Sequence, residues 1–290
     1  MKPAPFAYHD PKTLSEVTAL LARLEGAKLL AGGQSLMSMM NLRFVMPDHV
    51  VDLNGVADLD YIRESSGRLE IGAMTRQRAI ERSELVRAKA PVLVEALEQV
   101  GHHQTRNRGT IGGSLCHLDP AAELPGMAAL YDAELTVLGP KGNRKIALKD
   151  WALGYMTTAL EPDEVLTGIA FPLWRERHGH AFLEFARRHG DFAIVGVGCL
   201  LALDGAGAIA RAALVLVGVD VKPMRLDSVE TLLKGQVPGP ELWRAAADHA
   251  LKIEALSDAM VSGDYRKRLA GTLTARALAR AAERAGGARG

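Results

Sequence analysis

The sequence predicts an α+β protein with about two domains, and three observations lead to this expectation. The chain has 290 residues, whereas a single domain usually has roughly 100–200 residues. Segments in which apolar residues recur at helical spacing alternate with short apolar runs that are typical of strands. A charged, loop-like segment, Trp174–His180, separates two parts of different texture. We therefore expect one domain over residues 1–177 and a second over residues 178–290.

The first part is expected to begin with a short helix. Thr13-Leu14-Ser15-Glu16 has the pattern of a capping box, and apolar residues follow it at helical spacing. Further along, the patterns predict strands at 28–31, 50–53, 69–71 and 164–171, helices at 35–42 and 76–100, and a hairpin of 134–138 with 144–148. Pro91 interrupts the longer of these two helices.

The second part contains longer β-like runs. Apolar stretches at 192–203 and 208–219 predict two strands, and Asp204-Gly205-Ala206-Gly207 predicts the hairpin turn between them. Helical spacing of apolar residues predicts helices at 241–255 and 264–284. This part is therefore expected to be a small α+β domain.

Two glycine-rich segments carry the main functional information. They are Ala31-Gly32-Gly33-Gln34-Ser35-Leu36 and Arg106-Asn107-Arg108-Gly109-Thr110-Ile111-Gly112-Gly113-Ser114. Glycine permits positive φ and leaves no Cβ between the main chain and a ligand. Consecutive N–H groups can then converge into an anion-binding nest, and a helix that starts at the first segment would favour a phosphate there. Two such loops predict a site that grips the pyrophosphate of a dinucleotide from both sides.

Other nucleotide-binding patterns are absent from the sequence. A nicotinamide-binding chain would show G-x-G-x-x-G at the start of a βαβ unit, and a P-loop would show G-x-x-x-x-G-K-[ST]. Gly196-Val197-Gly198 lacks the third glycine and lies inside a β-like run. We interpret it as a strand that packs closely against a neighbour.

Composition excludes several further classes of protein. The formal net charge is +1, so no overall field attracts nucleic acid or anionic lipid. Cys116 and Cys199 are too few and too far apart for an iron–sulfur or zinc site of four thiolates, and we expect them to be buried free thiols. His102-His103 has no third ligand at useful spacing, so no metal is expected. With no signal-peptide pattern and no apolar run of about 20 residues, a cytoplasmic protein is expected.

Five blocks in order resemble a known family. They are residues 27–36, Arg106–Ser114, Asp119-Pro120-Ala121-Ala122-Glu123-Leu124-Pro125, Arg188-His189-Gly190-Asp191-Phe192-Ala193 and the stretch from Ser262 to Leu278. Together they are similar to the FAD-binding medium subunit of the molybdenum hydroxylases, the flavoproteins of the carbon monoxide dehydrogenase and xanthine dehydrogenase family. The resemblance covers nearly the whole chain.

The resemblance implies a fold and a cofactor site. The implied fold is a vanillyl-alcohol-oxidase or PCMH-type FAD-binding domain of two α+β subdomains, followed by a small α+β C-terminal domain. The implied FAD-binding residues are Leu29, Leu30, Ala31, Gly32, Gly33, Gln34, Ser35, Leu36, Val100, Gly101, Thr110, Gly112, Gly113, Ser114, Glu123, Leu166 and Phe192. It implies no catalytic side chain and no metal ligand on this chain.

Within this set, three residues have implied roles of their own. The carboxylate of Glu123 would accept from a ribose or ribityl hydroxyl, and Leu166 would make an apolar contact. Phe192 stands where some relatives place a tyrosine near the isoalloxazine ring, so the aromatic face is kept and the hydroxyl donor is lost.

One position departs from the family pattern. Relatives often carry a lysine seven residues before the aspartate of the Gly190-Asp191 pair, and this chain has Glu184 there. If that lysine neutralises flavin charge, Arg187 or Arg188 would have to do so here. The alternative interpretation is a solvent-facing glutamate on a loop.

The function implied by the resemblance is electron transfer within a larger enzyme. FAD on this chain would receive electrons from two-iron two-sulfur clusters on a small subunit, and a large subunit would hold the molybdenum cofactor. The FAD would pass the electrons to an external acceptor, and the complex would be a dimer of heterotrimers. Two alternatives remain open: a stand-alone FAD-dependent oxidase or dehydrogenase of the same fold, and an assembly subunit whose FAD site has decayed. The intact Gly-Gly pairs count against the second alternative.

Overall fold

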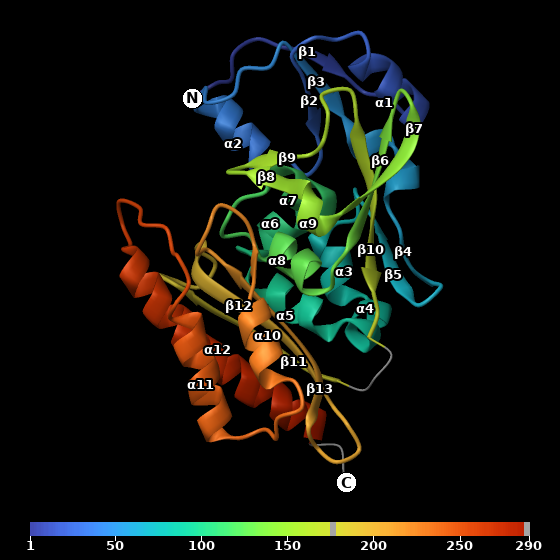
Figure 1. Cartoon of the computed structure of the whole chain (residues 1–290). Coiled ribbons are helices and arrows are strands. Elements are labelled where there is room, and N and C mark those ends of the chain that lie inside the picture. Colours follow the sequence, from blue (N-terminus) through green and yellow to red (C-terminus); the bar gives the residue numbers. More distant parts are fainter. Residues whose placement is uncertain (175–177, 287–290) are drawn as a thin grey trace.

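The computed structural model describes residues 1–174 and 178–286, and the expected domain boundary after residue 177 borders a segment outside the described residues. Within the described chain, the elements form three units, each with its own sheet (Figure 1). All three units mix helices with strands, so the α+β class is confirmed.

The N-terminal unit is a small parallel sheet with two helices. Its strands β1 (Ala7–His9), β3 (His49–Asp52) and β2 (Ala27–Leu30) pair in that order, and its helices are α1 (Leu14–Leu21) and α2 (Leu36–Asn41). The short 3-10 turns η1 (Leu53–Gly55) and η2 (Ala57–Leu59) lead out of it. Thr13 caps α1 as predicted, because its hydroxyl accepts the N–H of Glu16 at 3.2 Å. The Glu16 carboxylate, however, accepts the N–H of Lys12 at 2.6 Å rather than that of Thr13.

The second unit is an antiparallel sheet of five strands with helices beside it. The strand order is β4 (Ile62–Ser65), β5 (Arg68–Gly72), β10 (Val165–Pro172), β6 (Glu134–Gly139) and β7 (Gly142–Ala147). The helices are α3 (Gln77–Arg82), α4 (Glu84–Lys89), α5 (Pro91–Gln99), α6 (His103–Arg108), α7 (Ile111–His117), α8 (Glu123–Leu130) and α9 (Leu148–Trp151), and β8 (Ala152–Gly154) pairs with β9 (Thr157–Thr158). The helical pattern over 76–100 is divided into three helices, because Ser83 is extended and caps α4, and Pro91 starts α5.

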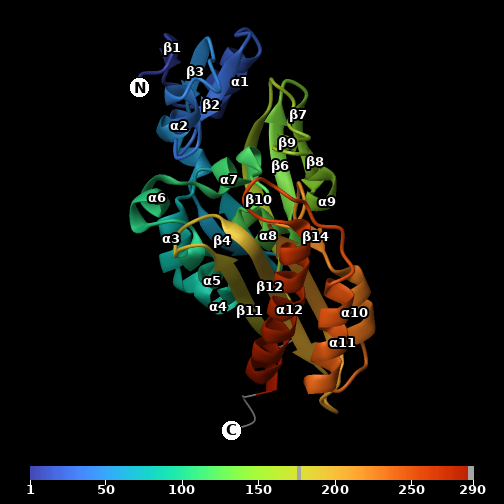
Figure 2. The ribbon, with the colours of Figure 1, turned by 90° about the vertical axis from the view of Figure 1, so that its left-hand side faces the viewer.

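The C-terminal unit is an antiparallel sheet of four strands covered by three helices (Figure 2). The strand order is β11 (His178–Ala186), β12 (Ala193–Leu203), β13 (Ile209–Val217) and β14 (Met224–Arg225), and the helices are α10 (Asp227–Leu233), α11 (Pro240–Ala250) and α12 (Gly263–Gly286). The predicted hairpin of β12 and β13 is confirmed. The prediction of a loop as far as His180 is wrong, since residues 178–180 begin β11 and pair with β12.

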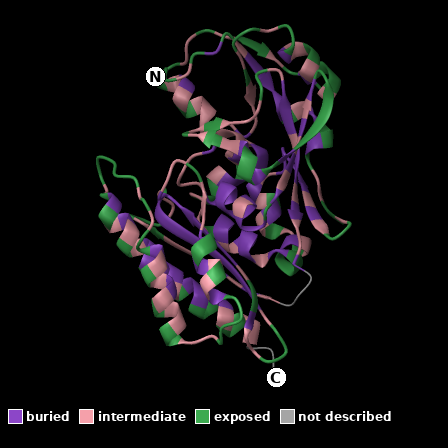
Figure 3. Ribbon diagram, viewed as in Figure 1, coloured by how far each residue is buried: buried purple, intermediate pink, exposed green. Residues whose placement is uncertain are grey.

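Strand β12 lies between two hydrophobic cores. Leu200 and Ala202 belong to the core that contains the side chains of α5 and α8 in the second unit. Val197, Cys199 and Leu201 belong to the core formed with α12. Alternate residues of a strand point to opposite faces, so a strand buried on both faces is apolar throughout. This burial explains the continuous apolar run in the sequence. Figure 3 colours the ribbon by burial and shows buried residues where the second and C-terminal units meet.

Candidate cofactor site

The two glycine-rich segments meet although 69 residues separate them in the sequence. A β-carbon on Gly32 would stand 2.3 Å from the carbonyl oxygen of Arg108 and 2.8 Å from the Cα of Gly109. Neither distance is possible for a real side chain, so only glycine lets these backbones touch. A β-carbon on Gly113 would lie 3.6 Å from that of Ala31, which places the start of α7 beside the same loop.

The first segment offers a row of unused hydrogen-bond donors. Among the described residues, no acceptor partners the backbone N–H groups of Gly32, Gly33, Gln34 or Ser35. Gly33 has a positive φ of 73°, which turns the backbone between β2 and α2. Helix α2 has only six residues, so its dipole is small. This loop would therefore hold an anion through its N–H groups. Gly32 is buried, Gly33 and Ser35 are half-buried and Gln34 is exposed, so the row of N–H groups borders the surface, where an anionic ligand can reach it.

The second segment is built differently from the prediction. Gly112, Gly113 and Ser114 lie in the first turns of α7, which Thr110 caps. The N–H of Gly112 donates to the carbonyl of Ala73 at 2.9 Å. The N–H of Gly113 donates to the hydroxyl of Thr110 at 3.1 Å, and that of Ser114 donates to the carbonyl of Thr110 at 3.2 Å. The prediction of a second anion-binding nest is therefore wrong. This segment instead supplies a backbone surface without side chains, against which the first loop packs.

Val100 and Gly101 connect the second unit to the loop that carries Phe192. Arg106 is 4% exposed and donates to the carbonyl of Val100 at 2.8 Å, while its Nε pairs with Glu81 at 2.9 Å. A β-carbon on Gly190 would lie 3.1 Å from the carbonyl oxygen of Gly101, so the loop between β11 and β12 packs on this turn. Phe192 follows in that loop with 71% of its surface exposed.

Two carboxyl groups are buried near each other at the boundary between the second and C-terminal units. Glu123 is the first residue of α8 and is 7% exposed, and burial raises its pKa to about 7. Oε2 of Glu184 is buried and has no hydrogen-bond partner among the described residues. Burial first, and the charge of Glu123 second, raise the pKa of Glu184 to about 8. Glu184 lies in β11, so the interpretation of a solvent-facing glutamate on a loop is wrong.

Leu166 occupies a different environment from the other predicted site residues. It lies in β10 with 3% of its surface exposed and belongs to the core of the second unit. The structure thus places the loop at 29–36 beside the segment at 110–114, and the turn at 100–101 beside the loop of Phe192, with Leu166 packed in the core.

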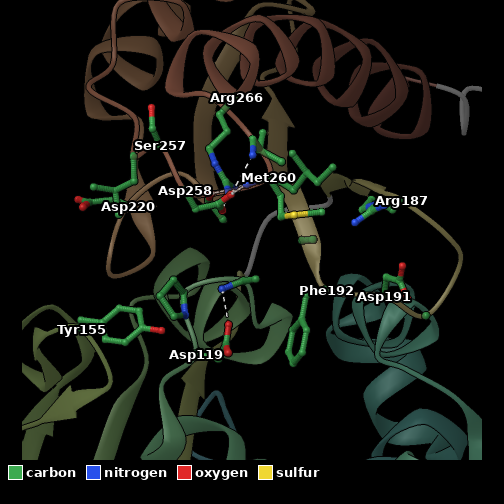
Figure 4. A pocket seen from close by; sticks show the side chains of 18 residues that line it. Asp119, Tyr155, Arg187, Asp191, Phe192, Asp220, Ser257, Asp258, Met260 and Arg266 are labelled. Carbon is green, nitrogen blue, oxygen red and sulfur yellow. Dashed lines mark hydrogen bonds and ion pairs between the residues drawn. The ribbon is translucent and has the colours of Figure 1, made fainter.

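A pocket of about 680 Å³ adjoins the loop of Phe192 (Figure 4). The second unit contributes Asp119, whose carboxylate accepts the N–H of Ala121 at 2.8 Å, and Tyr155, which is 64% exposed. On the other side, Arg266 donates to the carbonyl of Ile194 at 2.7 Å and forms an ion pair with Asp258. Of the predicted site residues, Phe192 alone lines this pocket among the residues described. Sequence patterns missed the pocket because its walls come from segments far apart in the chain.

The observed groups fit FAD. The donors of the first loop suit a diphosphate, and the missing side chain of Gly32 lets this loop pack directly on the backbone of Arg108 and Gly109. In the described ranges, 1–174 and 178–286, no three His, Cys, Asp or Glu side chains are grouped as a metal site would require. Nor does any helix in these ranges have the length and apolar character needed to span a membrane.

Comparison with known proteins identifies the family. Residues 4–174 match the model of the FAD binding domain in molybdopterin dehydrogenase, and residues 180–281 match that of the CO dehydrogenase flavoprotein C-terminal domain. The carbon monoxide dehydrogenase medium chain of Hydrogenophaga pseudoflava is 36% identical over 96% of this chain and 97% of its own. The caffeine dehydrogenase subunit beta of Pseudomonas sp. strain CBB1 is 35% identical over 98% of this chain and 97% of its own.

Solved structures agree with this assignment. A chain of carbon monoxide dehydrogenase from Hydrogenophaga pseudoflava superimposes with a TM-score of 0.94 at 37% identity, covering 98% of this chain and 99% of that chain. A chain of quinoline 2-oxidoreductase from Pseudomonas putida 86 gives 0.94 at 35% identity, covering 98% and 99%. The chain therefore belongs to the family of FAD-binding medium subunits of the molybdenum hydroxylases, and it is a flavoprotein subunit of an oxidoreductase.

Proposed function

We propose that this chain is the electron-transfer subunit of a molybdenum hydroxylase complex. The observation that carries the proposal is the row of unpaired N–H donors at Gly32–Ser35, seated on the backbone of a second glycine-rich segment. When bound, FAD would supply the capacity to take up electrons and release them to an external acceptor. The chain itself would bind the cofactor, orient it and set its electrostatic surroundings.

The proposed binding residues are those predicted from the sequence. The first loop would hold the diphosphate through its N–H groups, and the segment at 110–114 would form the wall behind it. Glu123 would meet a sugar or ribityl hydroxyl, and the exposed ring of Phe192 would lie at the isoalloxazine end, beside the pocket. Residues 1–177 would form a FAD-binding domain and residues 178–290 a C-terminal domain. The strands before and after this boundary belong to different sheets, which supports this division.

The proposed partners supply the remaining cofactors. A small subunit would hold two-iron two-sulfur clusters, and a large subunit would hold the molybdenum cofactor, in a cytoplasmic dimer of heterotrimers. Both cysteines of this chain are free, and each is buried enough to raise its thiol pKa, so the cluster ligands must come from elsewhere. One related structure is described as a Cu,Mo-CO dehydrogenase, in keeping with a molybdenum-containing partner.

One observation favours a second candidate function, a stand-alone FAD-dependent oxidase or dehydrogenase. The pocket beside Phe192 is large enough for a small organic substrate. In the electron-transfer proposal, the same pocket would admit the external acceptor.

The first test compares visible absorption spectra of the chain alone and of the chain purified with its partners. We expect a flavin spectrum in the isolated chain, and iron–sulfur bands only in the complex. The isolated flavoprotein should oxidise no substrate of the complex by itself. Substrate-dependent bleaching of the flavin without partners would establish the stand-alone enzyme instead, and a colourless chain and complex would refute both.

A matched pair of variants tests the placement of the diphosphate. Asparagine and aspartate have the same size and both tolerate the positive φ at Gly33, so Gly33→Asn and Gly33→Asp differ chiefly in charge. We expect Gly33→Asp to weaken FAD binding at least about a hundredfold more than Gly33→Asn, because a carboxylate would face the diphosphate. Flavin fluorescence titration measures both dissociation constants. Equal affinities would show that no phosphate lies at this loop.

A further inference from the structure

A chain of hydrogen bonds joins the two glycine-rich segments. The side-chain amide of Asn54 donates to the carbonyl oxygen of Ala31 at 3.1 Å. The guanidinium of Arg76 donates from Nη2 to Oδ1 of Asn54 at 2.5 Å, and from Nη1 to the carbonyl oxygen of Arg108. These bonds lead from the first loop to the second segment by a route separate from the backbone contact at Gly32. We call the two side chains the Asn54–Arg76 clasp.

The Asn54 end of the clasp is fixed by Asp52. This aspartate ends β3 and is 9% exposed. Its Oδ1 accepts the backbone N–H of Asn54 at 2.9 Å and the side-chain amide of Asn54 at 2.5 Å. Its Oδ2 accepts the hydroxyl of Tyr8 at 2.6 Å. The orientation of the Asn54 side chain is therefore set by the C-terminal end of the parallel sheet.

The Arg76 end is fixed by backbone pairing with the second segment. The N–H of Gln77 donates to the carbonyl of Gly109 at 2.8 Å, and the N–H of Ile111 donates to the carbonyl of Thr75 at 3.2 Å. Arg76 and Thr110 thus form an antiparallel bridge. Since both ends are anchored, the clasp is a second link between the N-terminal unit and the second unit at the cofactor site, beside the backbone contact at Gly32.

The carbonyl groups that the clasp engages have an electrostatic effect at this place. The carbonyls of Ala31 and Arg108 border the loop whose N–H groups are unpaired. A carbonyl oxygen carries partial negative charge and would repel a phosphate. A donor that binds it holds it in one direction and offsets part of that charge.

The charges around Arg76 indicate a role in geometry rather than in net charge. Burial first, and the nearby charge of Arg108 second, lower the pKa of Arg76, while Asp60 and Asp52 act in the opposite direction. A guanidinium stays charged in proteins, so two cations here face two carboxylates. The net charge of Arg76, Arg108, Asp52 and Asp60 together is therefore close to zero.

We propose that Asn54 and Arg76 are positioning residues of the FAD site, holding the two glycine-rich segments in contact so that the first loop presents its N–H groups to the diphosphate. This inference rests on the proposed FAD site in the first loop. Neither side chain belongs to the glycine-rich segments, and the role of the clasp follows from its contacts.

The test uses the full chain, freed of flavin and titrated with FAD. We expect Arg76→Gln and Arg76→Lys each to raise the dissociation constant about tenfold or more, with a faster release of FAD. Lysine keeps the charge but lacks the planar fork that reaches two acceptors at once. Arg82→Gln is the matched control, because Arg82 lies on the neighbouring helix α3 and is exposed.

A double-mutant cycle tests whether the two residues act as one unit. If the clasp is a single chain of bonds, Asn54→Ala combined with Arg76→Gln should weaken FAD binding about as much as either change alone. Thermal unfolding of the flavin-free variants is measured in parallel. It reports the stability of the fold separately from the affinity for FAD.

Three results would overturn the inference. Affinity retained in Arg76→Lys but lost in Arg76→Gln would mean that charge matters and the fork does not. Unchanged affinity with a lowered unfolding temperature of the flavin-free protein would mean a purely structural role. Fully additive effects of the two changes would mean independent contributions. Equal affinities of Gly33→Asp and Gly33→Asn would instead refute the site itself, so failure of the clasp and failure of the proposed function remain distinguishable.

Discussion

At the scale of single residues, the environment of Glu184 in the fold differs from what its local sequence indicates. A glutamate in a strand is unremarkable on a solvated face, yet Oε2 of Glu184 is buried without a partner among the described residues. Glu123 adds a second buried carboxyl close enough to raise the pKa of Glu184 further. Burial and the neighbouring charge of Glu123 therefore favour the protonated form of Glu184 at neutral pH.

This pair predicts a pH-dependent stability. In the folded chain the pKa of Glu184 is about 8, against an ordinary value of 4.5, so the folded state binds the proton more tightly than the unfolded state does. Stability should therefore fall as pH rises between these two values, and level off above the higher one. Glu184→Gln cannot ionise and should remove part of this fall, raising the unfolding temperature at pH 8 by about 3 °C or more relative to the wild type.

Thermal unfolding of the flavin-free chain from pH 5 to pH 8 measures this effect. Glu254→Gln serves as the control, because Glu254 is exposed and should follow the wild-type curve. If the unfolding temperature of Glu184→Gln fell with pH as steeply as that of the wild type, the prediction would be contradicted.

At the scale of elements, several glycines permit close packing rather than turns. Gly179 in β11 is the strongest case, since a β-carbon there would lie 1.8 Å from the carbonyl oxygen of Ala281 and 2.6 Å from the nitrogen of Ala285 in α12. Gly112 has the same role at the start of α7, where a β-carbon would stand 2.6 Å from the carbonyl oxygen of Ala73. A turn-forming glycine and a packing glycine look alike in sequence, which is why the second glycine-rich segment was predicted as a loop.

The close packing of β11 on α12 gives a direct prediction. Gly179→Ala must push the helix away from the strand, so we expect a loss of about 1–3 kcal/mol in the free energy of unfolding. Gly205→Ala in the turn between β12 and β13 is the control, because a β-carbon there meets nothing within 4 Å. Urea denaturation of both variants measures the difference, and equal stabilities would show that the helix can shift without cost.

At the scale of the whole molecule, Glu95 ties the second unit to the C-terminal unit. Its carboxylate accepts the backbone N–H of Phe182 at 2.9 Å and pairs with Arg284 at 2.6 Å and His180 at 3.5 Å. Burial alone would raise its pKa, but these three partners together hold it below the ordinary value. One side chain on α5 therefore links β11 and α12 to the FAD-binding part.

Removing this tie should loosen the docking of the two units. Glu95→Ala leaves the N–H of Phe182 without its acceptor and removes the ion pair of Arg284, which keeps only its bond to the carbonyl of His180. We therefore expect a loss of about 1–3 kcal/mol in the free energy of unfolding. Glu98→Ala, an exposed position on the same helix α5, controls for helix propensity. Calorimetric unfolding at pH 7 measures both, and equal effects of the two changes would mean that the tie contributes nothing.

The sequence by itself determined the α+β class, the hairpin of β12 and β13, the capped start of α1 and the family. These features depend on local spacing, turn residues and short motifs, which neighbouring residues encode. Only the tertiary structure decided that β12 is buried on both faces and that Oε2 of Glu184 is buried. It alone brought together Gly32 with Arg108 and Asn54 with Arg76, because contacts between distant segments depend on how whole units pack. The site is therefore readable in outline from the glycine-rich segments, whereas the side chains that position them are set by packing.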